Sequence, residues 1–398
     1  MKNNDYKKLA KEILEKMESE HIYLYHSITK EEILLFIDDC FEKYKIQNDF
    51  DFNYIMNVIL KKINGTLDAH TDFKYNKSQR LPFSFLMIDG DVYLVNVTNK
   101  YKKFLFSKLI SINDTPINTI LKEIRNSTSF QTESWFKHKA QEKLSDYYEI
   151  LSLPSISSDV SKLFFKFGND TMISLSLNQI NVLKDKLKKE DNSSELVFTL
   201  KKNFNYFIEE NKIVFIYNSC KDKNKELLKS IENVKKDIEN SSIDTFILDL
   251  RGNTGGDSSI IKPLIDYLRN SNLNLITLVD RGVFSSGIIA LNDMIDIGSE
   301  VIGEEVGAYI NGFGECTKYF QIDSFEYRIC QKYFYQENGE WRQINDKKQL
   351  MLSSKKIFIP EVIKSDIIVT PKMEDLKKGK DTILEYALNF HNKNWLKR

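Results

Sequence analysis

Two adjacent serines are the residues of this chain whose position most directly suggests chemistry. Ser285 and Ser286 lie in "LITLVDRGVFSSGIIALNDMI", between an apolar run that predicts a buried strand and a pattern that predicts a helix. A serine at a strand-to-helix turn presents its hydroxyl beyond the sheet edge, beside the free N–H groups and positive dipole end of the helix. Such a position suits the negative charge of a serine attack. The alternative is that Ser286 only caps the helix.

A glycine-rich segment lies upstream, in "FILDLRGNTGGDSS", where three of the 15 glycines fall within five positions. If strand 246–250 runs parallel to strand 275–279, both following loops emerge at the sheet edge where α/β proteins bind ligands. Gly255 and Gly256 would then aim a backbone N–H at an oxyanion beside Ser285. A phosphate site fits less well, because no Gly-x-Gly-x-x-Gly is present and Asp257 follows where a P-loop has lysine.

The elements that must position these residues follow from hydrophobic periodicity. Residues up to about 65 show helical spacing, and short strands begin near residue 81, with the turn signal "IDGD" between the first two. From residue 206 strands and helices alternate, which predicts an α/β domain with helices packed on a sheet. The main expected elements are helices 117–126, around 133–147, 222–240, 258–270 and 286–296, and strands "LFFKF", "MISLSL", "ELVFTL", "KIVFIYN", "TFILDL" and "NLITLVD". The segment "SEVIGEE" comes next, followed by the strand-rich stretch "KYFQIDSFEYRICQKYFYQ".

Composition narrows the classes of partner. The 398 residues carry 57 Lys plus Arg and 57 Asp plus Glu, so charge gives no reason to expect nucleic acid or an anionic membrane. No apolar window approaches the ~18 residues of a membrane span. The N-terminus is typical of an amphipathic helix rather than a signal peptide, so we expect a cytoplasmic protein.

Four scattered cysteines without a Cys-x-x-Cys pair indicate neither a zinc site nor a disulfide framework. Cys316 and Cys330 could face each other across a hairpin, but reduced core cysteines are the preferred interpretation. We therefore expect no metal and no cofactor.

Several segments together resemble the S41 serine peptidases, the carboxyl-terminal processing and tricorn-type group. They are "FILDLRGNTGGDSS", "VFSSG", "VIGEEVGAYINGFGE", "IPEVIKSDIIVT" and "GKDTILEYAL". Upstream, "INGTLDAHTDF" is similar to the Asp-x-His-Thr segment of the histidine-using members, and "LFSKLISINDTPINTI" is similar to part of the family's PDZ-like domain. The resemblance covers about residues 63–388. It implies a ClpP/crotonase-like catalytic domain and serine peptidase activity.

The resemblance implies a role for each matching residue. Ser285 falls at the nucleophile position, and Ser286 would contribute an oxyanion-hole N–H, with the second donor from Gly255 or Gly256. The lysine-using branch has its lysine about two dozen residues after the serine, where this chain has Asn311. A Ser–Lys dyad is therefore not expected.

A serine nucleophile needs a nearby base. The chain has five histidines, at positions 21, 26, 70, 138 and 391. His70 follows a glycine turn in a polar loop and matches the family's histidine segment, so we expect it to accept the seryl proton and return it to the leaving amine.

The orienting acid is Glu315 by the same resemblance, since it occupies the position of a glutamine in the lysine branch. Asp68 is an alternative, because on a strand it would share a face with His70. Glu337 and Glu340 are further alternatives, because they lie where tricorn-type members carry a glutamate.

These inferences predict an α/β (α+β overall) protein in four parts. They are an N-terminal helical domain with the His70 loop (1–78), a PDZ-like β module (79–130), a connecting region (131–205) and an S41-like catalytic α/β domain (206–398). The predicted function is hydrolysis of extended or unfolded peptides through an acyl-enzyme. The alternatives are an inactive S41-like module that binds peptides or apolar ligands, and a crotonase-type enzyme acting on thioesters. The oligomeric state stays open.

Overall fold

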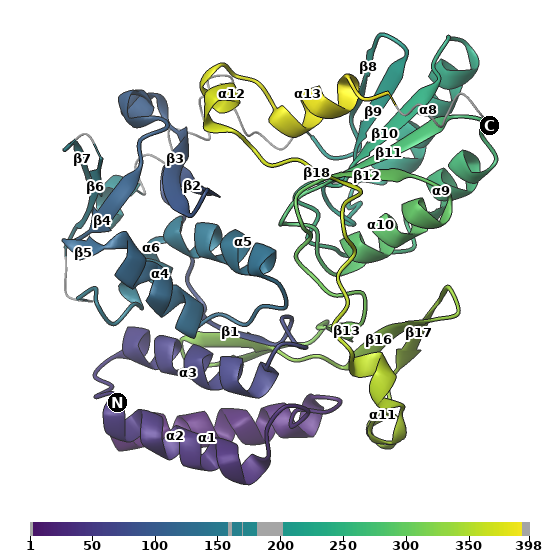
Figure 1. Ribbon diagram of the computed structural model, residues 1–398. Coiled ribbons are helices and arrows are strands. Elements are labelled where there is room, and N and C mark those ends of the chain that lie inside the picture. The colour runs from purple at the N-terminus through teal and green to yellow at the C-terminus, as the bar shows by residue number, and fades with distance from the viewer. Residues whose placement is uncertain (1–2, 158–160, 169, 181–201, 392–398) are drawn as a thin grey trace. The chain divides into compact units, whose positions relative to one another are not determined.

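The computed structural model describes residues 3–157, 161–168, 170–180 and 202–391, and the chain divides into two compact units (Figure 1). Unit 1 comprises Met1–Gln131, Lys139–Leu196 and Asn311–Pro360. Unit 2 comprises Thr132–His138, Val197–Ile310 and Glu361–Arg398. The division into four parts at residues 78, 130 and 205 stays a prediction.

Unit 2 is built on a sheet with the strand order β18-β12-β11-β10-β9-β8. Its strands are β8 (Tyr206–Glu209), β9 (Lys212–Ile216), β10 (Thr245–Asp249), β11 (Asn274–Val279), β12 (Glu300–Gly303) and β18 (Ile367–Ile368). Only β8 pairs antiparallel; the other described strands of this sheet are parallel to one another. Each residue of β10 is buried, as expected for a central parallel strand that helices cover on both faces.

Helices lie on the two faces of this sheet. They are α8 (Glu226–Glu239), α9 (Lys262–Arg269), α10 (Ser286–Asp296) and α13 (Thr382–Leu388). A further short helix of unit 2, α12 (Met373–Lys377), precedes α13 in the chain. Figure 1 shows α9 and α10 on the side of the sheet away from α13. Ile383, Leu384 and Ala387 of α13 pack on Ile276 and Ile302 of the sheet. The C-terminal segment therefore completes the core of unit 2.

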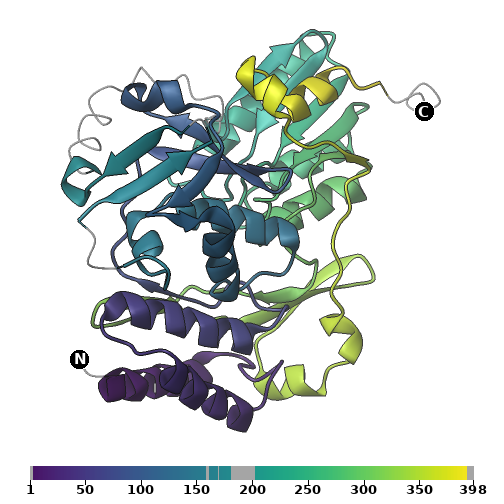
Figure 2. The same cartoon turned by 60° about the vertical axis from the view of Figure 1, so that its left-hand side comes forward.

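Unit 1 combines helices with small antiparallel sheets. Its helices are α1 (Asn3–Glu20), α2 (Lys30–Lys43), α3 (Asp49–Asn64), α4 (Ile117–Asn126), α6 (Tyr147–Leu151) and α11 (Lys347–Leu352), with 3₁₀ turns η1 (Asn99–Phe104) and η2 (Lys355–Phe358); α5 (Glu133–Leu144) is divided between the units. Figure 2 shows α1, α2 and α3 grouped together, with α3 above the other two.

The strands of unit 1 form four sheets among the described residues. They are β1 (Asp72–Tyr75) with β15 (Phe325–Arg328) and β14 (Tyr319–Ile322); β2 (Phe83–Ile88) with β3 (Asp91–Val97); β5 (Thr115–Pro116), β4 (Leu109–Ile112), β6 (Leu163–Phe167) and β7 (Met172–Leu175); and β13 (Gly312–Gly314), β16 (Lys332–Glu337) and β17 (Glu340–Ile344). The β1–β15 pairing joins the segment that carries His70 to residues more than 250 positions later.

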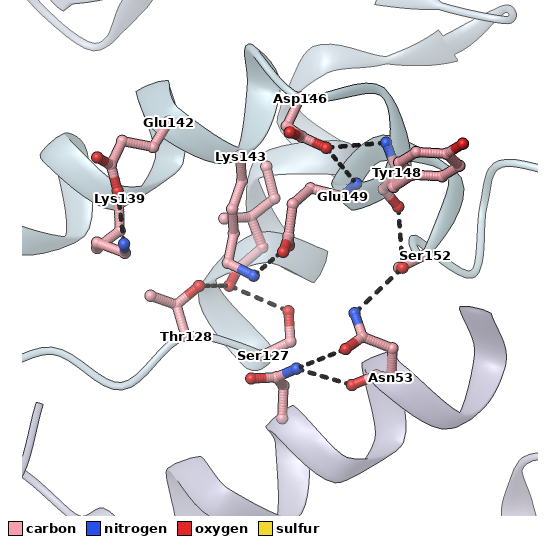
Figure 3. Close-up of polar contacts among 12 residues, drawn as sticks. Asn53, Ser127, Thr128, Lys139, Glu142, Lys143, Asp146, Tyr148, Glu149 and Ser152 are labelled. Atoms are coloured by element: carbon pink, nitrogen blue, oxygen red, sulfur yellow. Dashed lines mark hydrogen bonds and ion pairs between the residues drawn. The ribbon is translucent and has the colours of Figure 1, made fainter. Parts of the chain in front are cut away.

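A polar network ties α3 to the region of α6 (Figure 3). Asn53 Nδ2 of α3 donates to Ser152 Oγ at 3.2 Å, and Ser152 Oγ donates to the carbonyl of Tyr148 at 3.0 Å. Lys143 Nζ and Glu149 Oε2 lie 2.6 Å apart. Since buried polar groups that stay unpaired are costly, these bonds fix how the helices pack.

The mixed α/β class and the strand-helix alternation after residue 206 are confirmed. The turn "IDGD" is a tight hairpin turn with positive φ at Asp89 and Gly90. The predicted strand "ELVFTL" lies outside the described residues. No described helix is long and apolar enough to cross a membrane.

Three predicted helices have shorter bounds, and at each new boundary an aspartate side chain accepts hydrogen bonds from nearby backbone N–H groups. Asp257 accepts from Ser259 N, so α9 begins at residue 262 and not 258. Asp222 accepts from the first N–H groups of α8, which begins at residue 226. Asp146 caps α6, which ends the expected helix 133–147 at residue 144.

Candidate active site

The glycine-rich loop and the serine loop leave the same edge of one sheet. β10 and β11 are parallel neighbours, with Ile247 opposite Ile276. The pairing continues beyond the strands, because Leu250 N donates to Leu278 O at 3.0 Å. The predicted convergence of the two loops is confirmed.

Side chains and backbone then lock the two loops together. Asp280 Oδ1 accepts from Gly252 N at 2.8 Å and from Gly282 N at 2.9 Å, one N–H from each loop. Phe284 N donates to Asn253 O at 2.9 Å. The pKa of Asp280 is raised, first by burial and then by the nearby Glu304 charge. The N–H bonds from Gly252 and Gly282 and the nearby His138 oppose this rise in the pKa.

Ser285 occupies a strained turn between β11 and α10. Its backbone has φ +55° and ψ −127°, a conformation that a non-glycine residue adopts only when its surroundings enforce it. It holds the N-cap position without capping the helix with its side chain. Ser285 is half-buried, and no described side chain of unit 2 is hydrogen-bonded to its Oγ. The hydroxyl is therefore not consumed by local structure.

Ser286 is the first residue of α10, and its hydroxyl has a structural partner. Ser286 Oγ donates to the carbonyl of Gly256 at 2.6 Å, which fixes the glycine loop against the helix start. Its N–H belongs to the first turn, where intrahelical acceptors are lacking. This N–H is one candidate oxyanion donor.

Gly255 and Gly256 differ in what their N–H groups do. Gly255 N donates inward to Asn253 Oδ1 at 3.0 Å, and the fully buried Asn253 donates in turn to Tyr217 O at 2.7 Å. No described residue accepts from the N–H of Gly256. Of the two glycines, Gly256 is therefore the better candidate for the second oxyanion donor.

A histidine that the sequence did not single out lies near the serine loop. The His138 ring stacks on Trp135 at 4.8 Å between centroids, and Trp135 stacks on Phe284 at 3.9 Å. An added Cβ on Gly282 would lie 3.1 Å from His138 Nδ1. The sequence gives no signal for this stacking, because two aromatic rings three positions apart are common in helices. Only the contact with Phe284 in the structure brings His138 to attention.

His70 belongs to unit 1 and lies in a turn, not on a strand as the pairing with Asp68 would require. The backbone N–H of His70 donates to Asp68 Oδ1 at 2.8 Å, and the backbone N–H of Thr71 donates to the same oxygen at 2.9 Å. Burial lowers the pKa of His70 to about 4, although the Asp68 charge opposes this shift. The ring is therefore neutral, and able to accept a proton, at physiological pH.

The acidic candidates also lie in unit 1. Glu315, at φ +57°, forms an ion pair with Lys332 Nζ at 3.1 Å, and its role as the orienting acid stays a prediction. Glu337 and Glu340 both pair with Arg342 on the β16–β17 hairpin.

Asn311, at the position of the lysine branch's lysine, has a structural role in unit 1. Its Nδ2 donates to Ile357 O at 3.1 Å, and its Oδ1 accepts from Gln336 N at 3.0 Å. Both polar atoms of its side chain are thereby used in holding the backbone.

Among the described residues, one group of side chains is of the types and spacing that can hold a metal ion, and it lies in unit 1. His21, Asp68 and Cys330 of unit 1 bring one ligand atom each within 4.8 Å of one another.

No family model matches the chain, and no curated protein matches it by sequence. Solved structures do match. Mature CPAF complexed with lactacystin has a TM-score of 0.60 and 8% identity, over 96% of this chain and 97% of that chain. A second structure of mature CPAF gives 0.58 and 9%, over 96% and 95%. The photosystem II D1 C-terminal processing protease gives 0.41 and 10%, over 95% and 98%.

The fold of this chain is therefore the one that mature CPAF adopts, and the resemblance to the S41 peptidases drawn from the sequence is confirmed at the level of the fold.

The close approach of Gly255 to the serine loop makes a testable prediction. A Cβ on Gly255 would lie 2.8 Å from Ser285 Cβ and 2.9 Å from Ser286 N, whereas one on Gly339 would meet nothing within 4 Å. Both have positive φ, so alanine at either position costs about 1–2 kcal/mol in backbone strain. Gly255→Ala should cost about 1–3 kcal/mol more, because a packed loop must shift.

Native-state hydrogen exchange measures these costs, read at β10 and β11 amides for Gly255→Ala and at β16 and β17 amides for Gly339→Ala. Equal losses of protection would contradict the close packing of the two loops.

Proposed function

We propose that this protein is a serine peptidase that hydrolyses peptide bonds of extended or unfolded substrates through an acyl-enzyme on Ser285. The observation that supports the proposal is the interlocked pair of loops, in which the hydroxyl of Ser285 has no described partner in unit 2 and the backbone N–H groups of Gly256 and Ser286 have no described acceptor. The proposal assigns residues 206–398 to a ClpP/crotonase-like catalytic domain and residues 79–130 to a PDZ-like module.

In the proposed reaction Ser285 Oγ attacks the scissile carbonyl and His70 accepts its proton. The N–H groups of Gly256 and Ser286 hold the oxyanion, as donors fixed before the reaction begins. His70 returns the proton to the leaving amine, and water then hydrolyses the acyl-enzyme. Glu315 is the proposed orienting acid. The reaction requires neither metal nor cofactor.

Support for each residue is of a different kind. Ser285 has its strained backbone and its place at the sheet edge. For His70 the support is the family resemblance and a neutral ring, because burial lowers its pKa to about 4. Ser285 belongs to unit 2 and His70 to unit 1, so the pairing rests on the resemblance and awaits a functional test.

Ser285→Ala should abolish covalent labelling by a fluorophosphonate, because the attacking oxygen is removed. Ser286→Ala should still be labelled, but more slowly, since the bond from Ser286 Oγ to Gly256 O is lost while the N–H remains. Intact-protein mass spectrometry with peptide mapping measures both. Lactacystin, the compound in the mature CPAF complex, is a second probe.

A proteolysis assay complements the labelling experiment. Its substrate is an unfolded protein such as reduced casein, and cleavage at internal peptide bonds would identify an endopeptidase. Labelling of Ser285→Ala at the wild-type rate would move the nucleophile elsewhere. Labelling of the wild type without any cleavage would favour the inactive-binder alternative.

His70→Gln should slow labelling by about 10²- to 10⁴-fold, the usual contribution of a general base. His138→Gln is the matched control, because this histidine lies in unit 2 against the serine loop. Its labelling rate should stay within the same order of magnitude as that of the wild type.

The pH profile gives a second readout of the same base. Because the pKa of His70 is lowered to about 4, the base form persists as pH falls through 6.5, and the labelling rate should decline only toward pH 4. A decline centred near 6.5, or a large loss in His138→Gln with none in His70→Gln, would assign the base to another histidine.

A further inference from the structure

Two cysteines of unit 1 face each other beside the turn that carries His70. The antiparallel pairing of β13 with β16 ends at Gly314 opposite Lys332, and two residues further on Cys316 and Cys330 meet. Their Sγ atoms lie 3.0 Å apart, and both cysteines are free. A disulfide bond is about 2.05 Å long, so a shift of roughly 1 Å would suffice to form one.

The four cysteines of the chain differ in access to solvent. Cys40, Cys220 and Cys330 are buried, whereas Cys316 is only half-buried. Burial raises the pKa of Cys330 well above its usual range, as do its bond to Cys316 and the charge of Asp68. A reagent in solution therefore reaches Cys316 first, and Cys330 is the second thiol of the pair.

Cys330 is in direct contact with the His70 turn. Its Sγ donates to Asp68 Oδ1 at 3.4 Å, the same carboxylate oxygen that accepts from His70 N and Thr71 N. Its backbone N–H donates to Thr71 Oγ1 at 3.2 Å. The thiol hydrogen of Cys330 is thus part of the hydrogen-bond set that fixes this turn.

The hydrogen bonds of His21 argue against a metal ion in this cluster. His21 Nδ1 accepts from Tyr23 N at 2.9 Å, so the ring proton lies on Nε2, which donates to Asp68 Oδ2 at 3.0 Å. A metal ion bound to Nε2 would force the ring proton of His21 onto Nδ1. That N–H would then face the backbone N–H of Tyr23, and the hydrogen bond between His21 and Tyr23 would be lost. The arrangement fits a closed set of hydrogen bonds beside a dithiol.

We propose that Cys316 and Cys330 are a redox-active pair whose reversible disulfide loosens the Asp68–His70 turn. The oxidant is a small disulfide such as oxidised glutathione. The Cys316 thiolate attacks one of its sulfurs, forming a mixed disulfide and releasing one glutathione thiol. The Cys330 thiolate then attacks Cys316 Sγ and releases the second, so two protein thiols and one small disulfide become one protein disulfide and two small thiols.

Oxidation removes the S–H donor to Asp68, a fully buried carboxylate whose pKa is lowered by its bonds to His21 and Thr71. A buried carboxylate that loses a donor is held less firmly, so the turn opens more often. The effect on catalysis rests on the proposed function, because His70 is there the base.

The test titrates the purified full chain with glutathione redox buffers and follows disulfide formation by alkylation and peptide mapping. A loss of two alkylatable thiols and a cross-link between the peptides containing Cys316 and Cys330 are expected. The Cys40→Ala/Cys220→Ala variant should form the same cross-link as the wild type, whereas Cys316→Ser should form no cross-link. Circular dichroism checks that each variant is folded.

Hydrogen exchange then compares the reduced and oxidised forms at the amides of His70 and Thr71. Exchange should be faster by about two- to tenfold in the oxidised wild type, the range that loss of one hydrogen bond implies, and unchanged in Cys316→Ser. This readout does not depend on activity, so it separates failure of the redox pair from failure of the peptidase proposal.

In the fluorophosphonate experiment, the labelling rate of the wild type should fall on oxidation, and the labelling rate of Cys316→Ser should not. Absence of the cross-link at any glutathione ratio, unchanged exchange at both amides after it forms, or one zinc per chain in the protein as purified would each overturn the proposal.

Discussion

The parallel pairing of β10 with β11 is the constraint on which the candidate site depends. It makes two loops, more than 25 residues apart in sequence, leave one edge of the sheet side by side. Asp280 then joins them by accepting one N–H from each, and Ser286 Oγ closes the contact on Gly256. Because these bonds form before any substrate binds, the backbone donors need little reorganisation when charge develops.

The sequence predicts this part of the molecule well because its signals are local. Buried apolar runs identify β10 and β11, and the glycines and serines that follow mark where each strand ends. The position of Ser285 at a strand-to-helix turn follows from the same punctuation. The positive φ of Ser285 cannot be predicted in this way, because serine itself does not favour that backbone conformation.

What the sequence cannot predict are side-chain bonds between segments far apart in the chain. The Asn253 side chain takes the N–H of Gly255, which leaves Gly256 as the better donor. Asp68 is bound by His21 and Cys330, residues 47 and 262 positions away, and is not a strand neighbour of His70. Such bonds depend on the register of β1 with β15 and on burial, neither of which leaves a pattern in the local sequence.

The central claim is that these two loops form an oxyanion site around Ser285. The crystal structure of the covalent phosphonyl adduct tests it most directly. The account predicts phosphorus bonded to Ser285 Oγ and the phosphoryl oxygen about 3 Å from the backbone nitrogens of Gly256 and Ser286. An adduct on another residue, or a phosphoryl oxygen directed away from both nitrogens, would contradict it.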